Sequence, residues 1–152
     1  MTTSGTTASV AFDVTGTRVV TGTSDRIARI WDVATQRIVR SFEHASAVEY
    51  AAVNADGSLL AAGTRDGTVA IWDTTTSDLV AELHHPAPVN GVAFSPDGSH
   101  LLSAGDAHRA IVSRIELETR SPDIVAAFVR CHAPYRLNQT RLESATPSCD
   151  RP

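Results

Sequence analysis

A period of 41 residues runs through most of this chain and restricts its fold more than any other feature. The pair Trp31-Asp32 recurs as Trp72-Asp73, whereas a further step of 41 reaches Ser113-Arg114, where the pair has been lost. The same step connects turn dipeptides, apolar positions and single polar residues: Thr15-Gly16, Asp56-Gly57 and Asp97-Gly98; Phe12, Val53 and Phe94; Asp25 and Asp66; His44 and His85. Self-similarity at this period indicates stacked supersecondary units that bury a continuous core between neighbours.

Composition is typical of a globular chain with one real core. Its 152 residues are 42% hydrophobic, and the net charge of −4 argues against a basic surface for nucleic acid or anionic lipid. No stretch approaches the roughly 18 to 20 apolar residues of a membrane span, and the N-terminus lacks the basic and apolar regions of a signal peptide. We therefore expect a cytoplasmic protein with no nucleic-acid or membrane partner. Cys131 and Cys149 lie outside the repeats and are expected to be free thiols.

Each repeat consists of short apolar runs separated by turn residues. Asp56-Gly57 and Asp66-Gly67 mark two of these turns, since glycine readily adopts positive φ. The expected strands are 10–13, 18–23, 27–31 and 38–42 in the first unit; 48–53, 59–62, 68–72 and 79–83 in the second; and 89–94, 100–103 and 110–115 in the third. Connections this short pair consecutive strands antiparallel.

The predicted strands are apolar on both faces. Ile30 and Trp31 are adjacent, so they point to opposite sides of a sheet, yet both are strongly apolar. A sheet enclosed between two similar sheets explains this pattern, as in the blade-on-blade packing of a β-propeller. The expected fold class is all-β: a partial propeller of about three four-stranded antiparallel blades, followed by a short C-terminal helix.

Two segments carry a specific family resemblance. The stretch 92–98, Val-Ala-Phe-Ser-Pro-Asp-Gly, followed by 101–105, and the stretch 62–73, Ala-Gly-Thr-Arg-Asp-Gly-Thr-Val-Ala-Ile-Trp-Asp, resemble WD40 repeats. The resemblance covers about residues 8 to 115. We expect a flexible N-terminus at 1–7, WD40-like blades over 8–116 in units of about 8–48, 49–89 and 90–116, and a C-terminal helix and tail at 117–152.

The resemblance implies that a hydrogen-bonded set of His, Ser or Thr, Asp and Trp braces each blade. A buried indole N–H needs an acceptor, and buried polar side chains need partners. The matching positions, hereafter the bracing residues, are Thr21, Asp25 and Trp31; His44, Asp66 and Trp72; and His85 and Ser103. No unit is complete: Thr3 stands at the His position of the first unit, Ala62 at the Ser/Thr position of the second unless Thr64 substitutes, and Ala107 and Ser113 at the Asp and Trp positions of the third.

Three blades are fewer than the four to eight of a closed propeller. Copies of the chain could pair to complete a ring, the chain could be the C-terminal remnant of a longer propeller protein, or the region after 116 could cover an end. In that region Ser121-Pro122-Asp123 predicts a helix start, with an apolar stripe at 124, 125, 128 and 129. Segments 135–137 and 140–142 predict a small hairpin.

No constellation indicates catalysis or metal binding. His108, Cys131 and His132 lack zinc-like spacing, and no serine or cysteine lies in a recognisable nucleophile motif. The Asp residues beside Gly are best explained as turn residues, and no phosphate-binding loop occurs. We therefore expect no enzyme activity, no cofactor and no metal.

The preferred functional hypothesis is a non-enzymatic protein-protein interaction scaffold that binds a protein or peptide, or a second copy of itself. The resemblance places candidate partner-binding residues at the start of the first strand and in the second turn of each blade: Ser24, Ala47, Glu49, Arg65, Pro88, Asn90 and Asp106. The alternative is a degenerate remnant of a bacterial WD40 signalling protein, an ATPase or kinase fused to a propeller, without independent activity.

Overall fold

The computed structural model describes residues 2–106, 109–115, 136–138 and 141–143. The chain divides into two compact units, residues 1–115 and residues 116–152. In the second unit β12 (Arg136–Asn138) and β13 (Arg141–Glu143) pair antiparallel, as the hairpin prediction requires. The expected helix that starts near Ser121 lies outside the described residues.

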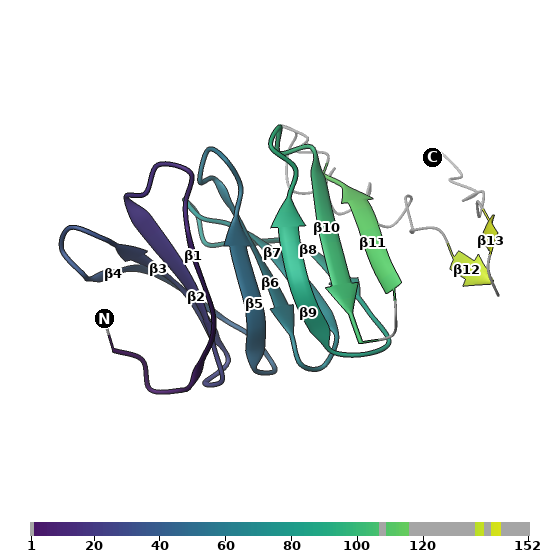
Figure 1. The fold of residues 1–152 in the computed structure, drawn as a ribbon, viewed down its shortest axis with the longest axis horizontal. Helices are drawn as coiled ribbons and strands as arrows, with labels where there is room; N and C mark the ends of the chain where they lie inside the picture. Colours follow the sequence, from purple (N-terminus) through teal and green to yellow (C-terminus); the bar gives the residue numbers. More distant parts are fainter. Residues whose placement is uncertain (1, 107–108, 116–135, 139–140, 144–152) are drawn as a thin grey trace, which may run out of the picture. The chain divides into compact units, whose positions relative to one another are not determined.

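Three antiparallel sheets form the first unit, and each is a meander of consecutive strands (Figure 1). Blade 1 has the strand order β1 (Thr7–Phe12), β2 (Arg18–Thr23), β3 (Ile27–Asp32) and β4 (Ile38–Glu43). Blade 2 follows with β5 (Val48–Val53), β6 (Leu59–Thr64), β7 (Thr68–Asp73) and β8 (Leu79–His84), and blade 3 with β9 (Val89–Phe94), β10 (His100–Gly105) and β11 (Arg109–Arg114). Blades 1 and 2 thus have the expected four strands, whereas the described part of blade 3 has three.

Glycines close the turns at register-equivalent places. Gly57 has φ of +74°, and Gly16 and Gly98, one repeat before and after it, have +69° and +70°. This conformation is strained for residues with a Cβ, so the first turn of every blade depends on glycine. At the second turn Gly67 has φ of +92°, but its equivalent in blade 1 is Arg26, which adopts +69°.

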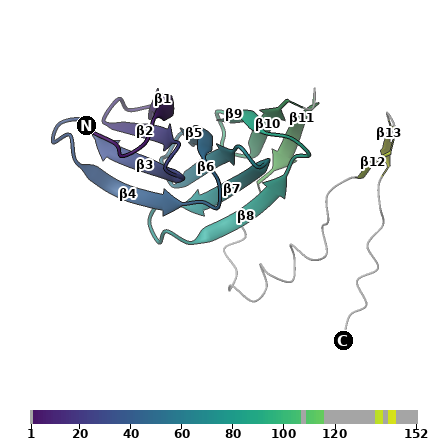
Figure 2. The same cartoon turned by 90° about the horizontal axis from the view of Figure 1, so that it is seen from below.

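The three sheets pack face to face, and the first strand of each blade, β1, β5 or β9, lies on the same side of the stack. Viewed from below, these strands lie on one side of the stack while β4 and β8 lie on the opposite side (Figure 2). Leu59 and Leu60, adjacent in β6, are 1% and 0% exposed, because they point into different inter-blade cores. Two-sided burial of the middle blade agrees with the prediction made from Ile30 and Trp31.

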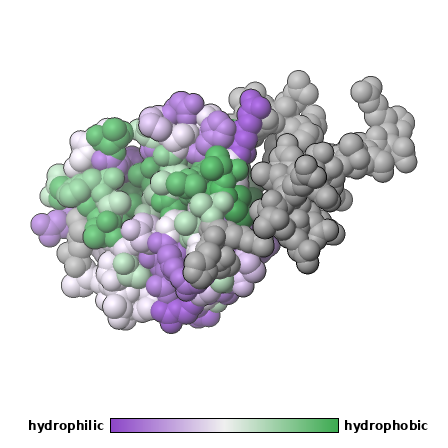
Figure 3. Space-filling model, turned by 45° about the vertical axis from the view of Figure 1, so that its right-hand side comes forward, coloured by the Kyte–Doolittle hydropathy of each residue, from purple (hydrophilic) through white to green (hydrophobic). Residues whose placement is uncertain are grey.

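Each core lies between one blade and the next. Between blades 1 and 2, Val20, Ile30 and Phe42 pack against Ala51 and Leu60. Between blades 2 and 3, the equivalent layer is formed by Leu59, Ala61, Val69 and Ile71 against Val89, Val92 and Leu101. On the surface, hydrophobic residues form a band across one face of the described strands, with polar residues above and below it (Figure 3).

Candidate functional site

The bracing residues of blade 1 meet as expected at the tryptophan but not at the aspartate. Trp31 Nε1 donates a hydrogen bond of 3.0 Å to Thr21 Oγ1. Asp25 accepts hydrogen bonds from Arg29 Nη2 at 2.7 Å, from Ser4 Oγ at 2.5 Å and from Thr23 Oγ1. Arg29, which is 7% exposed, therefore supplies the basic partner of Asp25 in a blade that has Thr3 at the expected His position. The bond from Arg29 holds the pKa of Asp25 well below its usual range.

Sequence reasoning missed the role of Arg29, although a signal was present. The register-equivalent residues in blades 2 and 3 are Ala70 and Ile111, both apolar. A charged residue at an otherwise apolar strand position predicts a buried partner, because an unpaired buried charge is very costly. Asp25, four residues before Arg29, is the carboxylate that pairs with it.

In blade 2 the bracing set is interrupted at Ala62. Both Trp72 Nε1 and His44 Nε2 are buried and have no hydrogen-bond partner among the described residues. Thr64 does not substitute for the missing hydroxyl, since it donates to Asp66 Oδ1 at 2.5 Å and to the Thr68 carbonyl at 2.9 Å. The indole and imidazole instead pack edge to face, with ring centroids 5.7 Å apart.

Burial changes the acid–base behaviour of the two bracing histidines. Desolvation lowers the pKa of His44 to about 4, and the nearby Asp66 carboxylate offsets only part of this effect. In blade 3 His85 Nε2 lies 2.8 Å from Ser103 Oγ, and burial lowers the pKa of His85 as well. Both histidines are therefore neutral structural groups near pH 7.

One edge of the three sheets, here called the loop face, is formed by the turns after β2, β6 and β10 and the segments before β1, β5 and β9. A backbone hydrogen bond joins these two parts in every blade. Ser24 N donates to Thr6 O at 2.9 Å, and the equivalent bonds join Arg65 N to Ala47 O at 2.9 Å and Asp106 N to Pro88 O at 3.0 Å. The loop face is thus held to the sheets in a repeated geometry.

Five of the seven candidate partner-binding residues lie on this loop face, and the other two, Glu49 and Asn90, lie next to it at the second position of β5 and β9. Arg65 Nε contacts Glu49 Oε1 at 2.7 Å, with 66% of the arginine side chain exposed. Asn90 Nδ2 donates to Asp106 Oδ1, and Ser24 Oγ accepts a bond of 2.9 Å from Thr6 N. The three blades therefore present different chemistry, a hydroxyl, an ion pair and an amide–carboxylate pair, at equivalent positions.

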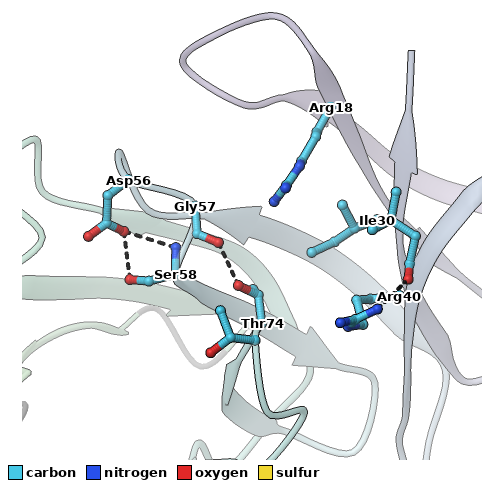
Figure 4. Close-up of a pocket in the computed structure, with 9 residues that line it drawn as sticks. Arg18, Ile30, Arg40, Asp56, Gly57, Ser58 and Thr74 are labelled. Carbon is cyan, nitrogen blue, oxygen red and sulfur yellow. Dashed lines mark hydrogen bonds between the residues drawn. The ribbon is translucent and has the colours of Figure 1, made fainter. Parts of the chain in front are cut away.

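A groove of about 340 Å³ opens between blades 1 and 2, away from the bracing residues (Figure 4). Arg18 and Arg40 point into it from blade 1, and neither forms a salt bridge with a described carboxylate. Across the groove, Asp56 accepts hydrogen bonds from Ser58, while Thr74 Oγ1 donates to the Gly57 carbonyl at 2.6 Å. The groove offers two guanidinium groups to an anionic or carbonyl group of a partner.

The described residues contain no group of three or more His, Cys, Asp or Glu side chains arranged to hold a metal ion. Within the same part of the chain, no helix is long and apolar enough to cross a membrane. His108, Cys131 and His132 lie outside the described residues.

Stacked four-stranded meanders with a repeating Trp and Asp register define a protein of the β-propeller class. The family model described as WD domain, G-beta repeat matches residues 2–32, 36–73 and 77–109, which is more than half of the chain. The chain belongs to the WD40 repeat family. The matched segments are offset from the blades by one strand: the first covers β1–β3, the second runs from β4 of blade 1 to β7 of blade 2, and the third runs from β8 of blade 2 through β10 of blade 3.

Solved structures show the same fold. The structure titled "Structure of U3-55K" aligns with a TM-score of 0.70 at 20% identity, covering 76% of this chain and 38% of that one. "Crystal Structure of Mitotic Checkpoint Complex" aligns with a TM-score of 0.68 at 25% identity, covering 75% of this chain and 35% of that one. This chain therefore spans little more than a third of each of these relatives. No match was found among the curated proteins.

Proposed function

We propose that this chain is a non-enzymatic protein-protein interaction scaffold that binds a protein or peptide through its loop face. The observation that carries the proposal is the repeated geometry of this face: the same backbone hydrogen bond recurs in three blades while the exposed side chains differ. A rigid frame with variable side chains is the arrangement that recognition surfaces on loops require.

The charges on the loop face support a polar peptide as the ligand. Arg65 is 66% exposed in its side chain, so its remaining N–H groups can reach a carboxylate or backbone carbonyl while Nε stays bound to Glu49. Asp106 and Asn90 are exposed on the next blade and offer acceptor oxygens. A peptide that lies across blades 2 and 3 would contact the Arg65 guanidinium on blade 2 and the acceptor oxygens of Asn90 and Asp106 on blade 3. This asymmetry favours one chain direction of the bound peptide.

Selection of binders from a random peptide library on the purified chain tests the proposal. We expect bound peptides whose capture falls at least tenfold in the variants Arg65→Glu and Asp106→Arg. The melting temperature should stay within a few degrees of the native value, because an exposed ion pair contributes only about 0–1 kcal/mol. Arg37→Glu is the matched control, since Arg37 is exposed and lies in the β3–β4 connection, outside the loop face.

Failure of every peptide to bind, or equal binding by native and loop-face variants, would overturn the loop-face proposal. That result would favour the alternative, a segment of a larger WD40 protein without independent activity.

A second copy of the chain is a further proposed partner, and a different observation favours it. Large apolar side chains are exposed on the first and third blades, among them Phe12 at 68% and Val112 at 67%. Exposed apolar faces of this kind mark association sites in repeat proteins.

A further inference from the structure

The first blade exposes residues that the following blades bury. Its entry face, defined here as the side of a blade that receives the preceding blade, carries Val10 and Phe12, which are both 68% exposed. The register equivalents of Val10 are Ala51 in blade 2 and Val92 in blade 3, and they are only 2% and 6% exposed. These three residues occupy the same position in the repeat. Their exposed fractions differ because no described blade covers the entry face of blade 1.

In the described part of the third blade, the residues on the opposite face are more exposed than their equivalents in blades 1 and 2. Its exit face, the side that meets the following blade, carries Leu102 at 44% exposure and Val112 at 67%. The equivalents of Leu102 are Val20 and Ala61, at 1% and 0%. The equivalents of Val112 behave in the same way: Ile30 is 2% exposed and Ile71 is 4% exposed.

Inside the chain, an exit face always packs against an entry face. Ile30 of blade 1 lies in one core with Ala51 of blade 2, and Val53 packs on that core. Ile71 of blade 2 lies in the next core with Val92 of blade 3, and Phe94 packs on it. The two exposed outer faces of the described blades are thus the unlike halves of a third interface of the same kind.

The side chains at the two ends also match in type. Val112 and Phe12 repeat the aliphatic–aromatic combination of Ile71 and Phe94. The neighbouring pair in the third interface, Leu102 with Val10, has larger side chains than the equivalent pair between blades 1 and 2, Val20 with Ala51. Blade 3 of one copy and blade 1 of the other should therefore lie slightly further apart at that level. Between the three described blades, no entry face packs against another entry face.

We propose that two copies of this chain associate head to tail, the exit face of blade 3 in each copy packing on the entry face of blade 1 in the other. This inference rests on the proposed self-association and adds its geometry. Unlike interfaces form a closed ring when the rotation between subunits permits and an open filament when it does not. Two three-blade arcs give six blades, which is within the four to eight of known propellers.

Light scattering of the full chain is the first test. We expect a mass of twice 16.1 kDa for the native chain at micromolar concentrations. The variants Phe12→Asp and Leu102→Asp should each give the monomer mass while keeping the native far-ultraviolet circular dichroism, because a charge on an apolar interface opposes association. Leu79→Asp is the matched control: Leu79 is 45% exposed, close to the 44% of Leu102, but it lies on blade 2.

Mixing the two end-face variants tests the direction of packing. A Phe12→Asp chain retains a native exit face, and a Leu102→Asp chain retains a native entry face. Head-to-tail association therefore predicts that the mixture regains dimers through one intact interface, although neither variant dimerises alone. A mixture that remains monomeric would overturn the head-to-tail geometry.

Chemical cross-linking separates failure of the geometry from failure of self-association. Val10→Cys and Leu102→Cys are placed in separate chains in which Cys131 and Cys149 are replaced by Ser, and a short bismaleimide is added. We expect a cross-linked dimer only in the mixture. A dimer formed by Val10→Cys alone would show like-to-like pairing and overturn head-to-tail packing while keeping self-association. A native chain that is monomeric in light scattering would overturn both, and a native mass of more than two chains would overturn ring closure.

Discussion

Trp31 Nε1 donates a hydrogen bond of 3.0 Å to Thr21 Oγ1, and this bond has no counterpart one repeat later. In blade 2 the position of Thr21 is occupied by Ala62, and both Trp72 Nε1 and His44 Nε2 are buried without a described partner. A buried polar atom without a partner costs about 1–3 kcal/mol. Blade 2 is therefore less stable than its burial alone implies.

Restoring the hydroxyl in blade 2 should stabilise the protein. Ala62→Ser places an Oγ where Ser103 stands in blade 3, and Ser103 bonds to the equivalent histidine at 2.8 Å. We expect the free energy of unfolding in urea to rise by about 1–2 kcal/mol. The control is Ala61→Ser, since Ala61 is also 0% exposed but points into the opposite core, where the hydroxyl should destabilise the fold. Equal destabilisation by both serines would contradict the prediction.

Loss of the Arg29 guanidinium should weaken blade 1. Arg29→Met leaves the Asp25 carboxylate, 15% exposed in its side chain, without its cation, and removal of one member of a buried pair typically costs about 3 kcal/mol. Urea unfolding at pH 7 measures the loss. Arg40→Met, an exposed residue in the adjacent strand with no described salt bridge, should change stability by far less.

The same ion pair predicts how stability depends on acid. The pKa of Asp25 is lowered in the folded state, so its contribution is fully present above the unfolded value near 3.8 and is lost as the pH falls below it. We expect unfolding free energies measured between pH 5 and pH 2 to fall less steeply in Asp25→Asn than in the native chain. Parallel curves for the two proteins would show that Asp25 is not the titrating group.

His44 gives a separate acid dependence at higher pH. Its folded pKa of about 4 lies below the ordinary value of 6.5, so folding favours the neutral imidazole. Its contribution to stability is complete above pH 6.5 and declines between pH 6.5 and 4 as the unfolded chain takes up the proton. Nuclear magnetic resonance of the imidazole nitrogens should give a midpoint near pH 4. His44→Gln should reduce the slope of stability over this interval, and a His44 midpoint near 6.5 would refute the burial effect.

Gly67 should tolerate a side chain poorly. A Cβ at this position would lie 2.4 Å from the His85 carbonyl oxygen, and the residue has φ of +92°. Gly67→Ala therefore combines backbone strain with a clash against backbone. Gly16→Ala is the matched control, since φ is +69° but no atom lies within 4 Å, and we expect only the strain of about 1 kcal/mol there. Thermal unfolding of both variants measures the difference.

The strands could be predicted closely from the sequence because the relevant signals are local. Alternating apolar residues and the Asp56-Gly57 turn determine β5 and β6 within a few positions, and the 41-residue register transfers the assignment to the other blades. The bracing contacts could be predicted less well. Whether Thr64 reaches Trp72 depends on the direction of its Oγ, which bonds to Asp66 and Thr68 instead.

The sequence by itself determined the repeat, which follows from matching residues 41 positions apart. It also determined the meander of strands and the two-sided apolar pattern, since these depend on residues a few positions apart. Only the tertiary structure decided that Arg29 pairs with Asp25, that Trp72 Nε1 and His44 Nε2 have no hydrogen-bond partner among the described residues, and that Phe12 and Val112 stay exposed. Those outcomes depend on atoms that a neighbouring strand or blade brings into contact. Sequence spacing alone does not specify which of these contacts form.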